Sequence, residues 1–159
     1  MSLLYDPNSK ESILEYAQRL ENSTIEATNK YYNSFAGRDS QELVADKTPP
    51  YLVNINDKGK FGNQLQLEYF GIPINNRSEP DFIESGLELK ASPLKTLKTT
   101  QELRVKERLV LGIIDYTAIT KETFFSSHFI DKNKHLLLVF YLYDKYIKST
   151  KLKIKLVES

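Results

Sequence analysis

The stretch Pro80-Asp81-Phe82-Ile83-Glu84-Ser85-Gly86-Leu87-Glu88-Leu89-Lys90 holds the residues on which the fold and the chemistry of this chain depend. Its second half alternates apolar and charged residues, which predicts a strand with Glu88 and Lys90 on one face. Gly86 permits a turn before that strand, and such a turn would bring Asp81 back beside it. Two carboxylates and an ammonium group would then meet at the edge of a sheet.

That grouping is typical of a site for phosphodiester hydrolysis. Carboxylate oxygens suit Mg²⁺, which is commonly held by one or two carboxylates together with phosphate oxygens and water. The metal polarises the phosphate and lowers the pKa of a bound water, and Lys90 would orient or deprotonate that water and stabilise the developing charge. The alternative is that these charges line the solvated face of an amphipathic strand, since an acid-x-Lys triplet should occur about twice by chance in this composition.

The composition describes one globular domain. The chain has 159 residues and 18.4 kDa, and 40% hydrophobic residues against 27% charged ones suffice for a core. It has no cysteine, which excludes disulfides, thiolate zinc sites and cysteine nucleophiles. No apolar stretch is long enough to span a bilayer and the start lacks a basic, apolar signal segment, so we expect no membrane association and a cytoplasmic location.

Three segments have the spacing of amphipathic helices: residues 10–20, 23–35 and 61–70. The first two begin at possible capping boxes, Asn8 with Glu11 and Ser23 with Glu26. The third should end at Gly71, which is followed by a proline. The polar residues 36–60 are expected to form a long irregular connection.

Four segments have the composition of strands: residues 87–91, 108–114, 136–143 and 151–156. The first three should form a mostly buried sheet. The fourth alternates lysine with apolar residues, which favours a lysine-protected edge strand over a phosphate contact. Tyr141 and Tyr143 alternate on a strand and are interpreted as sheet residues, not as a base-stacking platform.

Basic residues gather between the proposed strands. Residues 90–108 carry a local excess of +4, although the whole chain has a net charge of only +1. The candidates for DNA phosphate contact are Lys95, Lys98, Arg104 and Lys106. The alternative is a solvated basic loop that binds nothing.

Four segments, taken in order, resemble the MutH family, which comprises a strand-nicking mismatch-repair endonuclease and type II restriction enzymes that cut at GATC. They are the stretch from Lys58 to Gly71, Ser78-Glu79-Pro80-Asp81-Phe82, Gly86-Leu87-Glu88-Leu89-Lys90-Ala91-Ser92-Pro93 and Lys106-Glu107-Arg108-Leu109-Val110-Leu111. The similarity is strongest to the amino-terminal domain of the restriction branch.

The resemblance implies a restriction-endonuclease-like, PD-(D/E)xK fold: an α/β domain in which a mixed sheet flanked by helices presents the active site to DNA. It implies that Asp81, Glu88 and the Leu89 carbonyl hold Mg²⁺ and that Lys90 is the catalytic lysine. A further active-site lysine of the family corresponds to Lys132, although Asp131 or Lys134 could equally mark an ordinary polar turn there.

One position departs from the family pattern. Where members have a glutamate that supports the metal centre, four residues after Gly62, this chain has Gln66. An amide keeps the shape but removes the negative charge, so metal affinity should fall. Three outcomes are open: Glu68 substitutes through local distortion, Asp81 and Glu88 suffice, or cutting is lost.

The sequence therefore leads us to expect a Mg²⁺-dependent type II restriction endonuclease domain that cuts double-stranded DNA at GATC, 5′ of the G. The alternatives are a catalytically weak or inactive GATC-binding effector module and a mismatch-repair nicking endonuclease. We expect residues 1–159 to form a single domain, monomeric or joined to a second domain of the same fold as the amino-terminal part of a longer enzyme.

Overall fold

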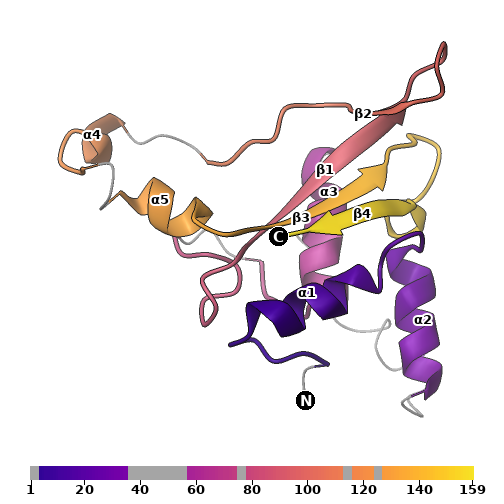
Figure 1. The fold of residues 1–159 in the computed structure, drawn as a ribbon, viewed down its shortest axis with the longest axis horizontal. Coiled ribbons are helices and arrows are strands. Elements are labelled where there is room, and N and C mark those ends of the chain that lie inside the picture. Colours follow the sequence, from indigo (N-terminus) through magenta and orange to yellow (C-terminus); the bar gives the residue numbers. More distant parts are fainter. Residues whose placement is uncertain (1–3, 36–56, 75–77, 113–115, 124–126) are drawn as a thin grey trace.

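The computed structural model describes residues 4–35, 57–74, 78–112, 116–123 and 127–159. Within them a mixed sheet has the strand order β2-β1-β3-β4 (Figure 1). The strands are β1 (Glu88–Thr96), β2 (Leu103–Val105), β3 (Leu136–Leu142) and β4 (Ile154–Glu158). The central strands β1 and β3 run parallel, and β2 and β4 pair antiparallel at the two edges. The mixed α/β sheet expected from the sequence is confirmed.

The helices of these ranges are α1 (Lys10–Gln18), α2 (Ile25–Phe35), α3 (Asp57–Gln64), α4 (Tyr116–Ile119) and α5 (His128–Asn133). A π-helical turn, Leu65–Tyr69, continues α3. Helix α1 contacts β4 and α3 contacts β1, whereas α4 and α5 lie beyond the end of the sheet where β1 and β3 begin (Figure 1). In the part of the chain that the structure describes, no helix has the length and apolar character needed to cross a bilayer.

The core lies between α1, α2 and α3 and one face of the sheet. Leu89 pairs with Leu137 and Ala91 pairs with Val139, so these side chains point to the same face. The helices contribute the other buried residues of this core, which include Ile13, Ala17, Leu20, Ile25, Phe61 and Leu65. The opposite face of β3 is only half-buried, as at Leu138.

The predicted helices are present, with different starts. Ser9, not Asn8, caps α1, because its hydroxyl accepts a hydrogen bond from the Ser12 amide at 3.1 Å. The Thr24 hydroxyl accepts from the Ala27 amide at the start of α2, one residue after the predicted cap. Helix α3 begins at residue 57, within the segment expected to be irregular, and residues 36–56 of that segment lie outside the described residues. The predicted end at Gly71 is confirmed, since its φ of +70° is left-handed.

Strand β1 extends the predicted residues 87–91 as far as Thr96. It includes Pro93, whose carbonyl accepts a hydrogen bond from the Lys106 amide at 2.7 Å. The proline nitrogen therefore also faces the side of β1 away from β3, and the hydrogen bonds between β1 and β3 lose no donor. The strand predicted over residues 108–114 is wrong for residues 108–112, and the rest lies outside the described residues. The chain leaves the sheet after Lys106, and Val110 is 71% exposed. A β-branched residue favours a strand only where a neighbouring strand offers a surface to pack on, and Val110 has none among the described residues.

Strand β4 is an edge strand, as its lysines indicated, but its alternation is broken. Phe140 pairs with Leu156 and Tyr141 pairs with Ile154, so the ladder skips Lys155 in a β-bulge. Leu156 is consequently 40% exposed, whereas Val157 is buried in the core. Backbone groups of residues 22 and 23 bond the Ile154 backbone, which covers this part of the edge.

The two faces of β3 predict unequal costs of truncation. Leu137→Ala should lower the free energy of unfolding by about 3 kcal/mol, because a fully buried leucine leaves a cavity in the core. Leu138→Ala, at a half-buried position on the opposite face, should cost about 1 kcal/mol. Urea denaturation of the two variants measures both values, and equal losses would contradict the assignment of the faces.

Candidate active site

A tight turn brings Asp81 to the start of β1. Phe82 and Leu87 exchange two backbone hydrogen bonds, of 2.9 and 3.2 Å, and Gly86 turns the chain between them with a φ of +67°. A residue with a β-carbon would be strained at that φ. The turn predicted at Gly86 is therefore present, and it sets Asp81 opposite Glu88.

Asp81 and Glu88 are held together through backbone and side-chain hydrogen bonds. The Asp81 amide donates to Glu88 Oε2 at 3.1 Å, and the Leu89 amide donates to Asp81 Oδ2 at 3.1 Å. Lys90 Nζ donates to the other Glu88 oxygen, Oε1, at 2.6 Å. The three residues predicted from the motif thus form one connected group.

Lys132 joins this group from α5. Its Nζ lies 3.7 Å from Glu88 Oε1, and its side chain is 26% exposed. The α5 N-cap is Ser127, whose hydroxyl accepts from the Ile130 amide and so starts the short helix that carries Lys132. The neighbouring Asp131 and Lys134 are exposed. Of the candidates in this segment, Lys132 is the one whose side chain contacts Glu88.

Gln66 contacts Asp81 directly. Its amide nitrogen Nε2 donates to Asp81 Oδ1 and to the Pro73 carbonyl, each at 3.2 Å. Glu68 lies elsewhere, because its carboxylate accepts from Gln64 Nε2 at 3.1 Å on the exposed side of the helix. The π-helical turn does not bring Glu68 into the site, so Gln66 takes the position beside Asp81.

The electrostatic state of the site follows from this crowding. Burial and the neighbouring Glu88 carboxylate raise the pKa of Asp81 to about 6, against the opposing effects of the Leu89 amide, Lys132 and Lys90. Glu88 itself is only 2% exposed. The site therefore holds two carboxylates and two lysines close together where little water reaches them.

The donor set fits a hard divalent cation. Asp81 and Glu88 supply carboxylate oxygens, and their mutual repulsion is what a cation beside them would relieve. The Leu89 carbonyl faces the same edge of β1 as its amide, which donates to Asp81, because both groups of a strand residue point to one side. The described residues contain no cluster of three or more His, Cys, Asp or Glu side chains, so the acidic donors here are these two carboxylates.

Three of the four predicted DNA-contact residues, Lys95, Lys98 and Arg104, lie away from Asp81, Glu88 and Lys90. Lys95 pairs with Arg104 in the hairpin of β1 and β2, and Lys98 lies in its turn. Lys95 follows Lys90 by five strand residues, or about 17 Å. The tip of this basic hairpin therefore lies far from Lys90, whereas Lys106 lies closer, at the level of Pro93.

A groove that the sequence did not indicate runs along β1 from Lys90. It has a volume of about 410 Å³ and lies between residues 89–93 of β1, residues 106–110 and the α3 glycines Gly59 and Gly62. Tyr141 of β3 and Tyr143, the first residue after β3, also line it. The paired glycines on one helix were the visible sequence signal, because they leave the helix without side chains on that side. We call this space the β1 groove.

Comparison with known proteins adds the family. The model of the family described as "DNA mismatch repair enzyme MutH" matches residues 70–158. The type II restriction enzyme Sau3AI of Staphylococcus aureus is 45% identical over 93 residues. The match covers 58% of this chain and 18% of that enzyme, so the matched part of the chain spans about a fifth of the length of this curated relative.

The raised pKa of Asp81 predicts a pH-dependent stability in the absence of divalent cations. Between its ordinary value of 3.8 and about 6, the folded protein binds more protons at Asp81 than the unfolded chain does. This contribution to stability is therefore complete at low pH and is lost as the pH rises through about 6. When the melting temperature is plotted against pH, the curves of the unsubstituted protein and of Asp81→Asn should diverge over this window. Parallel curves would refute the raised pKa of Asp81.

Proposed function

Because the chain belongs to the MutH family, we propose that it is a DNA endonuclease domain of the type II restriction class, dependent on Mg²⁺. Its mixed sheet with flanking helices is the restriction-endonuclease-like fold of that family. The observation that carries the proposal is the convergence of Asp81, Glu88 and Lys90 at the start of β1. The proposed reaction is hydrolysis of the phosphodiester bond 5′ of the G in GATC.

The proposed metal ligands are Asp81, Glu88 and the Leu89 carbonyl. Bound there, Mg²⁺ would supply a Lewis acid for the phosphate and a water of lowered pKa. The turn at Gly86 and the Leu89 amide hold the two carboxylates in place before any substrate arrives. Such fixed geometry avoids reorganisation during the reaction.

Lys90 is the proposed catalytic lysine and Lys132 its companion. Lys90 Nζ lies against Glu88 Oε1, so its ammonium group is at the position where a phosphate beside the carboxylates would develop charge. Lys132 approaches the same oxygen at 3.7 Å. Lys132 can therefore continue to neutralise Glu88 when Lys90 turns toward substrate or water.

The proposed substrate is double-stranded DNA. Lys95, Lys98, Arg104 and Lys106 are the proposed phosphate contacts, which would add affinity that falls with salt concentration. The GATC preference is carried over from the family resemblance. We further propose that residues 1–159 act as one cytoplasmic domain, as a monomer or joined to a second domain of the same fold in a longer enzyme.

Two alternatives have specific support. Gln66 in place of a carboxylate favours a weak or inactive GATC-binding effector module, because the site has one negative charge fewer beside Asp81. The description of the matching family model favours nicking in mismatch repair. Nicking shares the proposed chemistry, and it differs in cutting one strand and in its protein partners.

The nuclease proposal predicts cutting that depends on the motif. With Mg²⁺, the protein should cut a duplex containing GATC and leave a scrambled duplex intact. Lys90→Ala should slow cutting by about 10²- to 10³-fold, because a preorganised charge is lost from the reacting phosphate. Glu88→Gln should slow it at least as much, and Glu84→Gln, an exposed carboxylate in the same turn, should not change it. Gel analysis of single-turnover reactions measures the rates.

The outcomes separate the candidates. Preferential binding of the GATC duplex without cutting would favour the effector module. Cutting confined to one strand would favour mismatch-repair nicking. Cutting that survives in Glu88→Gln would contradict the assigned site.

The Gln66 contact predicts a second effect. Gln66→Glu places a carboxylate against Asp81 and the Pro73 carbonyl, so the melting temperature without Mg²⁺ should fall. With the extra negative charge, the Mg²⁺ concentration giving half-maximal cutting should fall by about 10-fold, as typical for groups that support metal ligands. Unchanged values for both would mean that Gln66 does not act on the metal ligands.

A further inference from the structure

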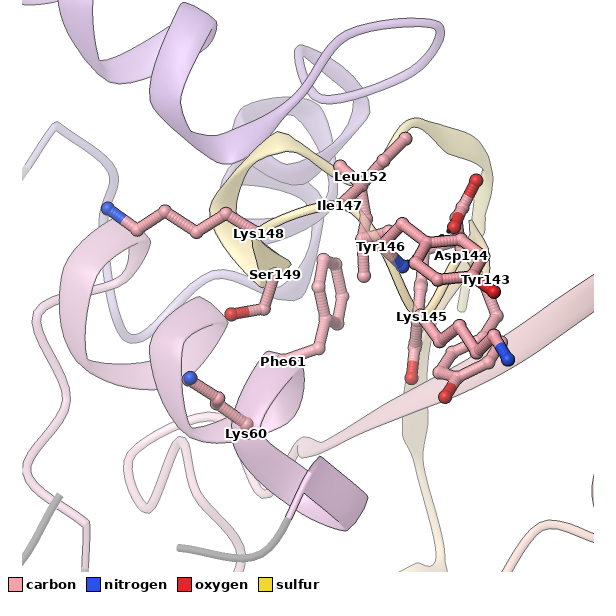
Figure 2. Close-up of a pocket in the computed structure, with 11 residues that line it drawn as sticks. Lys60, Phe61, Tyr143, Asp144, Lys145, Tyr146, Ile147, Lys148, Ser149 and Leu152 are labelled. Carbon is pink, nitrogen blue, oxygen red and sulfur yellow. Dashed lines mark hydrogen bonds between the residues drawn. The ribbon is translucent and has the colours of Figure 1, made fainter. Parts of the chain in front are cut away.

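A second pocket adjoins the β1 groove at the far end from Lys90. It has a volume of about 250 Å³ and lies between the start of α3 and the loop of residues 143–149 that follows β3 (Figure 2). Phe61 points into its centre, and the Ser149 hydroxyl bonds Gln64 at its side. We call this space the distal pocket.

The distal pocket and the β1 groove are neighbours on the surface. Tyr141 and Tyr143 line both. The Tyr143 amide donates to the Leu94 carbonyl at 3.0 Å, which fixes the junction beside the fourth residue after Lys90. At the rise of a β-strand, that position is about 13 Å from Lys90. Two adjacent depressions therefore lie between the proposed catalytic lysine and the loop of residues 143–149.

Positive charge follows this path. The β1 groove is lined by three basic residues, Lys90, Lys106 and Arg108, against one acidic residue, Glu107, which forms an ion pair with Lys106. Lys106 Nζ also lies 4.4 Å from the centre of the Tyr143 ring. The distal pocket adds three more lysines, Lys60, Lys145 and Lys148, against a single acidic residue, Asp144.

The distal pocket is surrounded by exposed basic and aromatic side chains. Lys60 and Lys148 extend on one side of Ser149, and Lys145 extends on the other (Figure 2). Tyr146 is 84% exposed, with Lys145 Nζ 4.7 Å from its ring centre. All three lysines are exposed. Exposed ammonium groups suit the separate phosphates of a nucleic-acid backbone, whereas a small-molecule site encloses most of its ligand.

We propose that the distal pocket binds the phosphate backbone of duplex DNA on the 5′ side of the cleaved bond, outside GATC. This inference rests on the proposed function, because it places the scissile phosphate at Lys90. A separation of about 13 Å corresponds to about 4 base pairs, so Lys145 and Lys148 contact phosphates from about the fourth base pair outward. The Tyr146 hydroxyl is a further phosphate donor.

The test is the salt dependence of binding. Fluorescence anisotropy in Ca²⁺, a hard cation that takes the same kind of ligands, measures affinity for two GATC duplexes with flanks of about 3 and about 15 base pairs. On the long duplex, Lys145→Ala/Lys148→Ala should reduce the slope of log affinity against log salt by about 2, since each lost phosphate contact contributes about 0.9. On the short duplex the same variant should match the unsubstituted protein.

The matched control is Lys30→Ala/Lys155→Ala, which removes the same charge from α2 and β4. Neither lysine lines the groove or the pocket, so the slope should not change. An equal effect of both double variants, or an effect that persists on the short duplex, would overturn the distal contact. The proposal would also be overturned if Lys145→Ala/Lys148→Ala changed the salt slope for single-stranded DNA but not for the long duplex.

The same experiment tests the proposed function and the distal contact separately. If the unsubstituted protein shows no salt-dependent binding to either duplex, DNA binding itself is refuted, and the distal contact with it. If it binds and cuts the short duplex normally while the lysine variant changes nothing on the long one, only the distal contact is wrong.

Discussion

The buried carboxylate of Glu88 is the constraint on which the rest of this site depends. It is 2% exposed, and a buried charge left without partners costs about 3–5 kcal/mol. Its compensation comes from three separate places: the Asp81 amide across the turn, Lys90 on the same strand and Lys132 on α5. Each partner is fixed by a different element. The folded arrangement of the turn, the strand and the helix is therefore required to surround that one buried carboxylate with hydrogen-bond donors and positive charge.

The parallel pairing of β1 and β3 is what makes this convergence possible. Parallel strands begin at the same end of a sheet, so the helix that precedes β3 and the turn that precedes β1 meet there. The Glu88 amide donates to the His135 carbonyl at 2.9 Å, which ties the chain directly before β3 to the first residue of β1. Lys132 is three residues earlier. An antiparallel pairing of these strands would have placed α5 at the other end, beside the basic hairpin.

The sequence predicted the parts of this site that are local. The turn at Gly86 and the common face of Glu88 and Lys90 depend on neighbouring residues, and both are observed. Lys132 came only from the family resemblance, since no local pattern reports a contact across 44 positions. The strand predicted over residues 108–114 is wrong over residues 108–112, because apolar composition cannot tell whether a neighbouring strand edge is available. The alternation predicted for β4 is broken because a bulge at Lys155 changes which face the following residues point to.

The exchange of a carboxylate for Gln66 changes how the site is held together as well as its charge. An amide nitrogen donates to Asp81, whereas a carboxylate at the same place would repel it. In this chain Asp81 has two donors, Gln66 and the Leu89 amide, so its orientation is fixed without a cation. The same donor reduces the negative potential that attracts a cation. The metal-free site is therefore held rigid by two hydrogen bonds to Asp81, and a cation beside it would be attracted less strongly than beside a third carboxylate.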